Sequence, residues 1–272
     1  MIAEKIIGEI EKFAPLEAAA KWDNSGIQCI SENIHISKMA LCLDPSYSLI
    51  EKAINNGAHF ILTHHPLLLE PVYFNKFDNY QKILALLVKN DLWLYSAHTS
   101  LDANPEGPVR FLAEALKLKN IEVLDPFYVD NNKPEKQFGY GLLGYLPKPI
   151  TAKVFVQKLG ALLDLDTITL WGALPYDRII EKIAYCPGSG ADFIDRAQEK
   201  SCDLYISGDI KYHKALEAKI PILDVGHHSL EENMMHHFYN ILQNTLKDLE
   251  VFFLPSKSPM KTIILNNTGE IK

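Results

Sequence analysis

Apolar residues recur with two different periods along the 272-residue chain, and their alternation predicts an α/β fold. Short apolar runs typical of buried strands lie at 38–43, 59–63 and 92–97. Segments with helical spacing lie at 2–13, 46–55, 78–90 and 107–118. This βαβα order is the one expected of a mostly parallel sheet flanked by helices.

A second block with the same alternation follows a polar loop at 125–136, which contains two prolines. The block predicts strands at 138–146, 167–171, 179–185, 203–207 and 221–225, helices at 151–163, 190–200, 211–218 and 229–247, and strand-like pieces at 250–254 and 261–265. We therefore expect two α/β units, one formed by residues 1–125 together with 225–272 and the other by residues 126–224.

The two blocks also resemble each other in sequence. With a constant offset of 144 and no gap, residues 40–65 align with residues 184–209, and the identities include Cys42 with Cys186. Generic βαβ periodicity alone would explain part of the match, but the ungapped register favours an internal duplication. The expectation is a fold of two similar, interleaved units with mixed or mostly parallel sheets.

Imidazoles and carboxylates follow the predicted strands, where an open α/β sheet holds its site. The strand-end groups are His64, His65, His98, Asp102, His227 and Glu231. Residues four apart on a helix share a face, so His227 and Glu231 can converge on one ion. The same geometry is less expected for Asp102, because Pro105 follows within three residues. A loop carboxylate is the expectation there.

This combination of side chains favours a metal site. Imidazoles and carboxylates without thiolates suit Zn, Fe, Mn or Co, and two ions roughly 3.5–4 Å apart would need about this many ligands, with one carboxylate bridging. His98 is either a ligand or a residue that holds another ligand in place. Asp209 and His213 are also four apart; they are either an acid/base or metal-supporting pair, or a helix cap and a surface histidine.

Composition narrows the possible functions. The net charge is −7 and only three residues are arginine, so no basic stripe is available to neutralise a nucleic-acid backbone. The four cysteines are widely spaced, which argues against a thiolate zinc site and against a disulfide framework. No apolar run approaches the roughly 18 residues of a membrane span, and the N-terminus has no signal-peptide pattern, so we expect a cytoplasmic protein with a small-molecule substrate.

Five segments, in order along the chain, resemble one known family. They are WDNSGIQ (22–28), ILTHHPLL (61–68), SAHTSLDA (96–103), SGDIKYH (207–213) and DVGHHSLEE (224–232). Together they resemble the GTP cyclohydrolase 1 type 2 homologues, also called interacting-factor-three-like proteins. The motifs span nearly the whole chain.

The resemblance implies a dinuclear metal centre in a toroidal homohexamer. The five metal-binding positions of the family fall on His64, His65, Asp102, His227 and Glu231, with Glu231 contributing to both ions. The family name implies hydrolytic opening of the guanine ring of GTP. His98, Asp209 or His213 would then transfer protons. Two alternatives use the same ions: a metal-dependent phosphoesterase, and a non-catalytic metal-binding scaffold or regulator.

Overall fold

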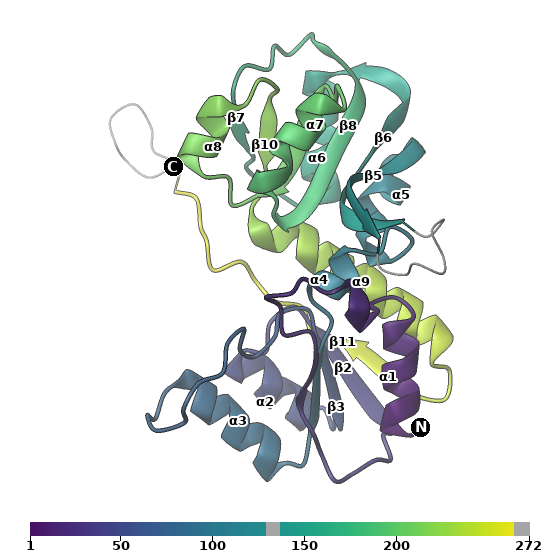
Figure 1. The fold of residues 1–272 in the computed structure, drawn as a ribbon, viewed down its shortest axis with the longest axis vertical. Coiled ribbons are helices and arrows are strands. Elements are labelled where there is room, and N and C mark those ends of the chain that lie inside the picture. The colour runs from purple at the N-terminus through teal and green to yellow at the C-terminus, as the bar shows by residue number, and fades with distance from the viewer. Residues whose placement is uncertain (129–136, 264–272) are drawn as a thin grey trace.

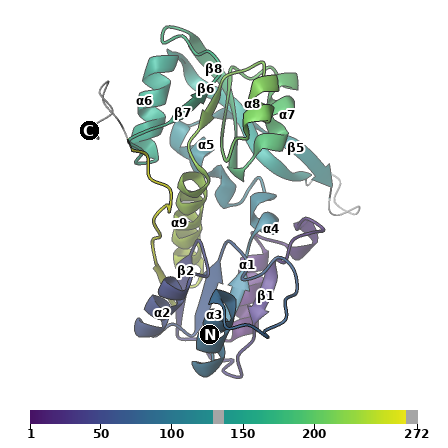
Figure 2. The same ribbon diagram turned by 90° about the vertical axis from the view of Figure 1, so that its left-hand side faces the viewer.

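The computed structural model describes residues 1–128 and 137–263, and it has two β-sheets flanked by helices (Figures 1 and 2). The helices are α1 (Ala3–Glu11), α2 (Tyr47–Asn55), α3 (Asn79–Lys89), α4 (Thr99–Asp102), α5 (Phe111–Leu116), α6 (Ala152–Leu162), α7 (Ile194–Glu199), α8 (Tyr212–Glu217) and α9 (His227–Thr245), with 3-10 turns η1 (Leu16–Ala18), η2 (Pro108–Arg110) and η3 (Ala191–Phe193). The strands are β1 (Gly26–Cys29), β2 (Lys38–Cys42), β3 (Phe60–Thr63), β4 (Trp93–Ser96), β5 (Lys119–Tyr128), β6 (Gln137–Thr151), β7 (Thr169–Trp171), β8 (Ile179–Ser189), β9 (Leu204–Gly208), β10 (Ile222–Asp224) and β11 (Glu250–Phe253). The predicted α/β class is confirmed.

The first sheet has five strands in the order β1-β4-β3-β2-β11, with β1 antiparallel and the others parallel. All residues of β3 and β4 are buried because helices cover both faces of the sheet. On one face Ala40 and Ile61 pack against α2 and α3, and on the other Leu41 and Leu62 pack against α1 and α9. Burial on both faces explains why these strands are continuous apolar runs in the sequence.

The second sheet has six strands in the order β5-β6-β8-β9-β10-β7. It is mixed: β8, β9 and β10 run parallel, while β5, β6 and β7 pair antiparallel with their neighbours. Helix α9 packs against strands of both sheets and crosses between the two lobes (Figures 1 and 2). Its buried residues Met234, Met235 and Phe238 belong to one core that contains residues of both sheets.

The two segments aligned at an offset of 144 form the same β–α–β arrangement. In the first copy β2 pairs with β3 through Met39 and Phe60, and in the second β8 pairs with β9 through Ile183 and Leu204. Each residue of the second pair lies 144 positions after its counterpart, so the strand register is the same here; it continues to match as far as Tyr185, after which the second copy shifts. The origin of this similarity by duplication remains a prediction.

Several predicted boundaries were wrong for local reasons. Strand β5 pairs with β6 up to Tyr128, so the start of the expected loop at 125–136 is a strand, and the second sheet begins at Lys119 rather than after residue 125. The expected helix 107–118 is η2 followed by α5, which ends at Leu116; Lys117 caps the helix with a left-handed φ of 57°. Strand β1 was not predicted; it is a four-residue edge strand whose register shifts between Ile27 and Cys29.

The expected strand at 261–265 is also corrected in part. Residues 261–263 are not in a strand, and 264–265 lie outside the described residues, as do 129–136 of the expected loop.

The four cysteines are free and buried, as expected of small core residues. Within 1–128 and 137–263, no helix has both the length and the apolar character needed to cross a bilayer.

Candidate metal centre

The chain bends sharply at the carboxyl end of β3, and this bend presents two imidazoles. The amides of His64 and His65 both donate to the carbonyl of Leu43, each at 3.1 Å. The hydroxyl of Thr63 donates to the carbonyl of His65 at 2.8 Å, and that of Ser96 donates to the carbonyl of His64 at 2.6 Å. Because successive residues would otherwise point to opposite faces of the strand, this bend allows both rings to face one region.

In each of four histidines of the site, one ring nitrogen forms a hydrogen bond with an oxygen atom. Nδ1 of His64 is 2.8 Å from the carbonyl of Ala97, and Nδ1 of His65, His98 and His227 is 2.7 Å from a carboxylate oxygen of Asp44, Asp23 and Asp209, respectively. A carbonyl or carboxylate can only accept, so Nδ1 must carry the hydrogen in each ring. In the neutral ring, Nε2 is then free to bind a cation, the arrangement commonly seen for metal-ligating histidines.

Helix α9 brings the last two predicted ligands into the site. Gly226 adopts a φ of 76° before the helix, and His227 and Glu231 lie one turn apart, with His227 Nε2 3.0 Å from Glu231 Oε2. Gly188 of β8 lies against the carboxylate, since a Cβ there would be 2.2 Å from Glu231 Oε1. The second sheet therefore helps to position a side chain that faces the first.

The polar atoms at the centre of the site converge without satisfying each other. With the histidine rings neutral, His64 Nε2, Asp102 Oδ1 and Glu231 Oε2 are buried acceptors with no donor between them; Glu231 Oε2 gains donors only when His65 and His227 are protonated. His64 Nε2 lies 3.7 Å from Asp102 Oδ1 and 3.6 Å from Glu231 Oε1, while His65 Nε2 lies 3.2 Å from Glu231 Oε2. These separations resemble the roughly 3.3–3.5 Å between ligand atoms around a tetrahedral ion with bonds of about 2.0–2.1 Å.

The residues present therefore fit divalent cations. Two sets of three ligand atoms each lie within 4.8 Å of one another: His64 with His65 and His98, and His65 with His227 and Glu231. The buried, unpartnered atoms are explained by a cation that they would share, because leaving such groups unsatisfied is otherwise unfavourable. His98 lies close enough to be a sixth candidate ligand.

Asp102 lies in a helix, and the expectation of a loop carboxylate was wrong. The amide of Asp102 donates to the carbonyl of His98 at 3.2 Å within the single turn α4. Pro105 does not prevent this turn, because α4 ends before the residues that the proline restricts. Burial raises the pKa of the Asp102 carboxyl to about 6, and the charge of Glu231 adds to this effect.

Neighbouring carboxylates raise the pKa values of two histidines of the site. Burial opposes protonation of His65, but hydrogen bonds with Asp44 and Glu231 outweigh it and raise the pKa of His65 to about 10. The hydrogen bond with Glu231 raises the pKa of His227 to about 9, against the effect of burial. A metal ion must displace these protons, so binding and pH are linked.

The structure separates the three residues predicted to be catalytic. His98 lies in the cluster, with its ring centroid 5.1 Å from that of His64. Asp209 lies beside the cluster and its carboxylate bonds His227, so it positions a ligand. His213 is exposed on α8 and its ring contacts Tyr212; within the described part of the chain, no hydrogen bond, ion pair or ring contact joins it to the metal ligands.

Three residues of the site were missed in the sequence. Asp44 lies two residues after the end of β2, so its position near a strand end was an available signal. Asp23 lies in the segment WDNSGIQ but was not predicted to belong to the site; its side chain is fully buried and bonds His98. Tyr140 of β6 lies close to Asp102, whose charge, after burial, raises the pKa of Tyr140 to about 12. No local pattern marks Tyr140.

Comparisons with known proteins identify the family of the chain. The profile of the Duf34/NIF3 (NGG1p interacting factor 3) family matches residues 1–259. Proteins named GTP cyclohydrolase 1 type 2 homolog are similar: that of Clostridium perfringens is 33% identical over 93% of this chain and 95% of its own length, and that of Methanocaldococcus jannaschii is 34% identical over 93% and 99%.

Solved structures share the fold. The Bacillus cereus protein related to NIF3 superposes with a TM-score of 0.87 at 23% identity, covering 97% of this chain and 99% of that one. Reduced HcgD from Methanocaldococcus jannaschii superposes with a TM-score of 0.79 at 33% identity, covering 93% and 98%. The agreement extends over both lobes of the molecule.

Proposed function

Because the chain belongs to the Duf34/NIF3 family, we propose that it is a hydrolase that depends on two divalent metal ions. The proposed ligands are His64, His65, Asp102, His227 and Glu231. Glu231 would bridge, with Oε1 toward His64 and Oε2 toward His65 and His227. The ligand types suit Zn, Fe, Mn or Co.

One observation carries this proposal. Three buried acceptor atoms, on His64, Asp102 and Glu231, converge at the same place with no donor between them while the histidine rings are neutral. An unsatisfied buried polar group costs about 1–3 kcal/mol, and more when it is charged. A site that leaves three such atoms together is best explained by cations that satisfy them.

The surrounding residues support hydrolytic chemistry. Bound ions of this kind lower the pKa of a water ligand and polarise the group that it attacks. Asp44 and Asp209 hold the rings of His65 and His227, which keeps their Nε2 atoms directed inward. Asp23 holds His98 in the same way, so His98 Nε2 is placed to accept or donate a proton at the edge of the cluster.

For the substrate, we propose the guanine ring of GTP or of a related nucleotide. The support is the similarity to relatives named GTP cyclohydrolase 1 type 2 homolog. Incubation of the purified protein with GTP should release formate, and Asp102→Asn and Glu231→Gln should abolish the release. Phosphate or a nucleotide monophosphate without formate would instead identify a phosphoesterase. Absence of both products with metal-loaded protein would favour a non-catalytic scaffold.

The assembly is a separate proposal. The toroidal homohexamer implied by the family resemblance predicts a native mass of six chains, which native mass spectrometry would measure. A monomeric mass would contradict it.

The cytoplasmic location likewise stays a prediction, which fractionation of cells would test.

A further inference from the structure

A cavity of about 720 Å³ opens beside the metal ligand His65. Its walls come from the loop after β2, from α2 and α3, and from residues 255–259 near the end of the described chain. Polar and charged groups line it, including Ser46, Ser48, Lys52 and Lys257. Its volume is within the range of about 300–1,000 Å³ that is typical of small-molecule sites.

The wall formed by residues 255–259 is anchored in place. The amide of Ser256 donates to Glu232 Oε1 at 2.7 Å, and its hydroxyl donates to Glu232 Oε2 at 2.8 Å. Nε2 of His228 is 2.7 Å from the same hydroxyl. Glu232 immediately follows the proposed bridging ligand Glu231, so helix α9 fixes both the ligands and the segment that carries Lys257.

The lysines of this cavity have no carboxylate partner. Among the described residues, Lys52 and Lys257 form no ion pair within 4.0 Å, and both are exposed. Asp44, the carboxylate that lines the cavity, accepts from His65 Nδ1 at 2.7 Å. The cavity therefore presents two uncompensated positive charges next to the metal ligands of an acidic protein.

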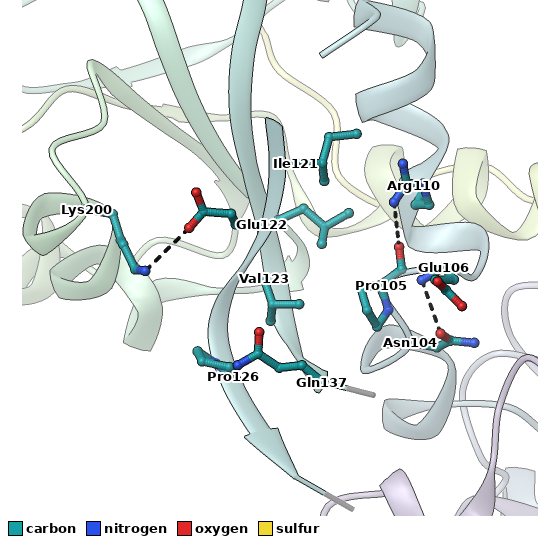
Figure 3. Close-up of a pocket in the computed structure, with 11 residues that line it drawn as sticks. Asn104, Pro105, Glu106, Arg110, Ile121, Glu122, Val123, Pro126, Gln137 and Lys200 are labelled. Atoms are coloured by element: carbon teal, nitrogen blue, oxygen red, sulfur yellow. Dashed lines mark hydrogen bonds and ion pairs between the residues drawn. The ribbon is translucent and has the colours of Figure 1, made fainter. Parts of the chain in front are cut away.

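A second cavity shows the contrast. It has a volume of about 360 Å³, contains none of the proposed ligands, and also has two cations in its wall (Figure 3). There Lys200 pairs with Glu122 at 3.6 Å, and Arg110 donates to the carbonyl of Pro105 at 3.2 Å (Figure 3). Both cations of this cavity therefore have partners within the protein. Lys214 of α8, which lines neither cavity, also has one, since it pairs with Asp192 at 3.1 Å.

We propose that the cavity beside His65 binds the phosphate groups of the substrate, with Lys52 and Lys257 as the residues that recognise them. The ligand class is a phosphorylated small molecule whose reacting part lies at the metal ligands. This inference rests on the proposed function for the position of the reacting part. The two lysines are positioning residues, because they bind a part of the substrate that does not react.

The test uses the as-purified protein with inorganic pyrophosphate as the probe and isothermal titration calorimetry as the measurement. Lys52→Gln and Lys257→Gln should each weaken pyrophosphate binding roughly tenfold, the value of one charge-assisted contact. Lys200→Gln is the matched control, since it removes a cavity lysine that already has a partner; its binding should equal that of the parent protein. The same two variants should raise the KM for GTP without lowering kcat.

The outcomes separate this inference from the proposed function. Loss of pyrophosphate binding in Lys52→Gln and Lys257→Gln, without any turnover of GTP by the parent, would support the cavity and refute the hydrolase. Turnover with an unchanged KM in both variants would support the hydrolase and overturn the cavity. The proposal for the cavity would also be overturned if the three variants and the parent bound pyrophosphate equally. It would likewise be overturned if the parent did not bind millimolar pyrophosphate.

Discussion

Replacement of Gly188 by alanine should disturb the metal site from the opposite sheet. Gly188 lies at the end of β8 with a φ of 64°, and an added Cβ would be 2.2 Å from Glu231 Oε1 and 3.2 Å from Glu231 Cδ. An ordinary contact is about 3.5–4.0 Å, so relieving the 2.2 Å approach requires the carboxylate oxygen to move by about 1.3–1.8 Å. The left-handed backbone adds a cost of about 1–2 kcal/mol for alanine.

The expected result has two parts. Because Glu231 is the proposed bridging ligand, a displacement of this size should weaken metal affinity at least 10- to 100-fold, the loss typical when support of a ligand is removed. The free energy of unfolding of the metal-free protein should fall by only about 1–2 kcal/mol, which leaves the chain folded. Competition with a fluorescent zinc chelator measures the first quantity, and urea denaturation measures the second.

Gly8→Ala is the matched control. Gly8 lies within helix α1, and a Cβ there would meet no atom within 4 Å. This variant should keep the metal affinity and gain about 0.5–1 kcal/mol of stability, because alanine favours the helix more than glycine does. The reasoning would be refuted by a folded Gly188→Ala protein that competes for zinc as well as Gly8→Ala.

Three further predictions concern the histidines and their partners. Asp23→Asn should lower the free energy of unfolding by about 1.5–3 kcal/mol at pH 7, because it removes a buried charged partner of His98. Burial raises the pKa of Asp23, but hydrogen bonds, foremost that with His98, hold this pKa well below its ordinary value. The stabilisation that Asp23 contributes to folding is therefore fully present above about pH 4 and is lost as the pH falls through the depressed pKa. Urea titrations at several pH values check this, and a difference that persists at strongly acidic pH would contradict it. Metal affinity should rise between pH 6 and 8, because the metal must displace protons from His65 and His227, whose pKa values are raised in the ion-free protein. The expected rise is about tenfold per pH unit for each proton displaced. Chelator competition that is independent of pH would argue against these residues as ligands. His213→Ala should leave metal content and turnover unchanged, since His213 is exposed on α8; loss of either would show that it acts at the site.

Much of the fold follows from local pattern because the central strands are buried on both faces. The apolar run at 59–63 is β3, and the pair His64-His65 lies at its carboxyl end as expected of an α/β sheet. The ungapped similarity between residues 40–65 and 184–209 corresponds to the same strand register up to Tyr185, where the register of the second copy shifts. Edge strand β1 was missed because only its end residues Gly26 and Cys29 are buried, so its four residues show no alternation of apolar and polar positions.

The parts of the site that the sequence did not indicate depend on contacts between distant segments. Asp23 and His98 are 75 residues apart, and only the folded chain shows that the carboxylate holds the ring. Gly188 and Tyr140 approach the ligands from the second sheet, so no spacing within one motif could identify them. Spacing did identify His227 and Glu231, because one helical turn is enough to bring them together.

Elemental analysis of the purified protein tests the central claim most directly. Inductively coupled plasma mass spectrometry, on protein prepared without added metal and without chelators, should find close to two divalent ions per chain. Glu231→Gln should lose both ions, because Glu231 faces both His64 and His65, whereas His213→Ala should keep them. The account would be contradicted if the parent protein held no stoichiometric metal and also failed to bind added zinc or manganese. A Glu231→Gln variant that kept both metal ions would contradict it as well.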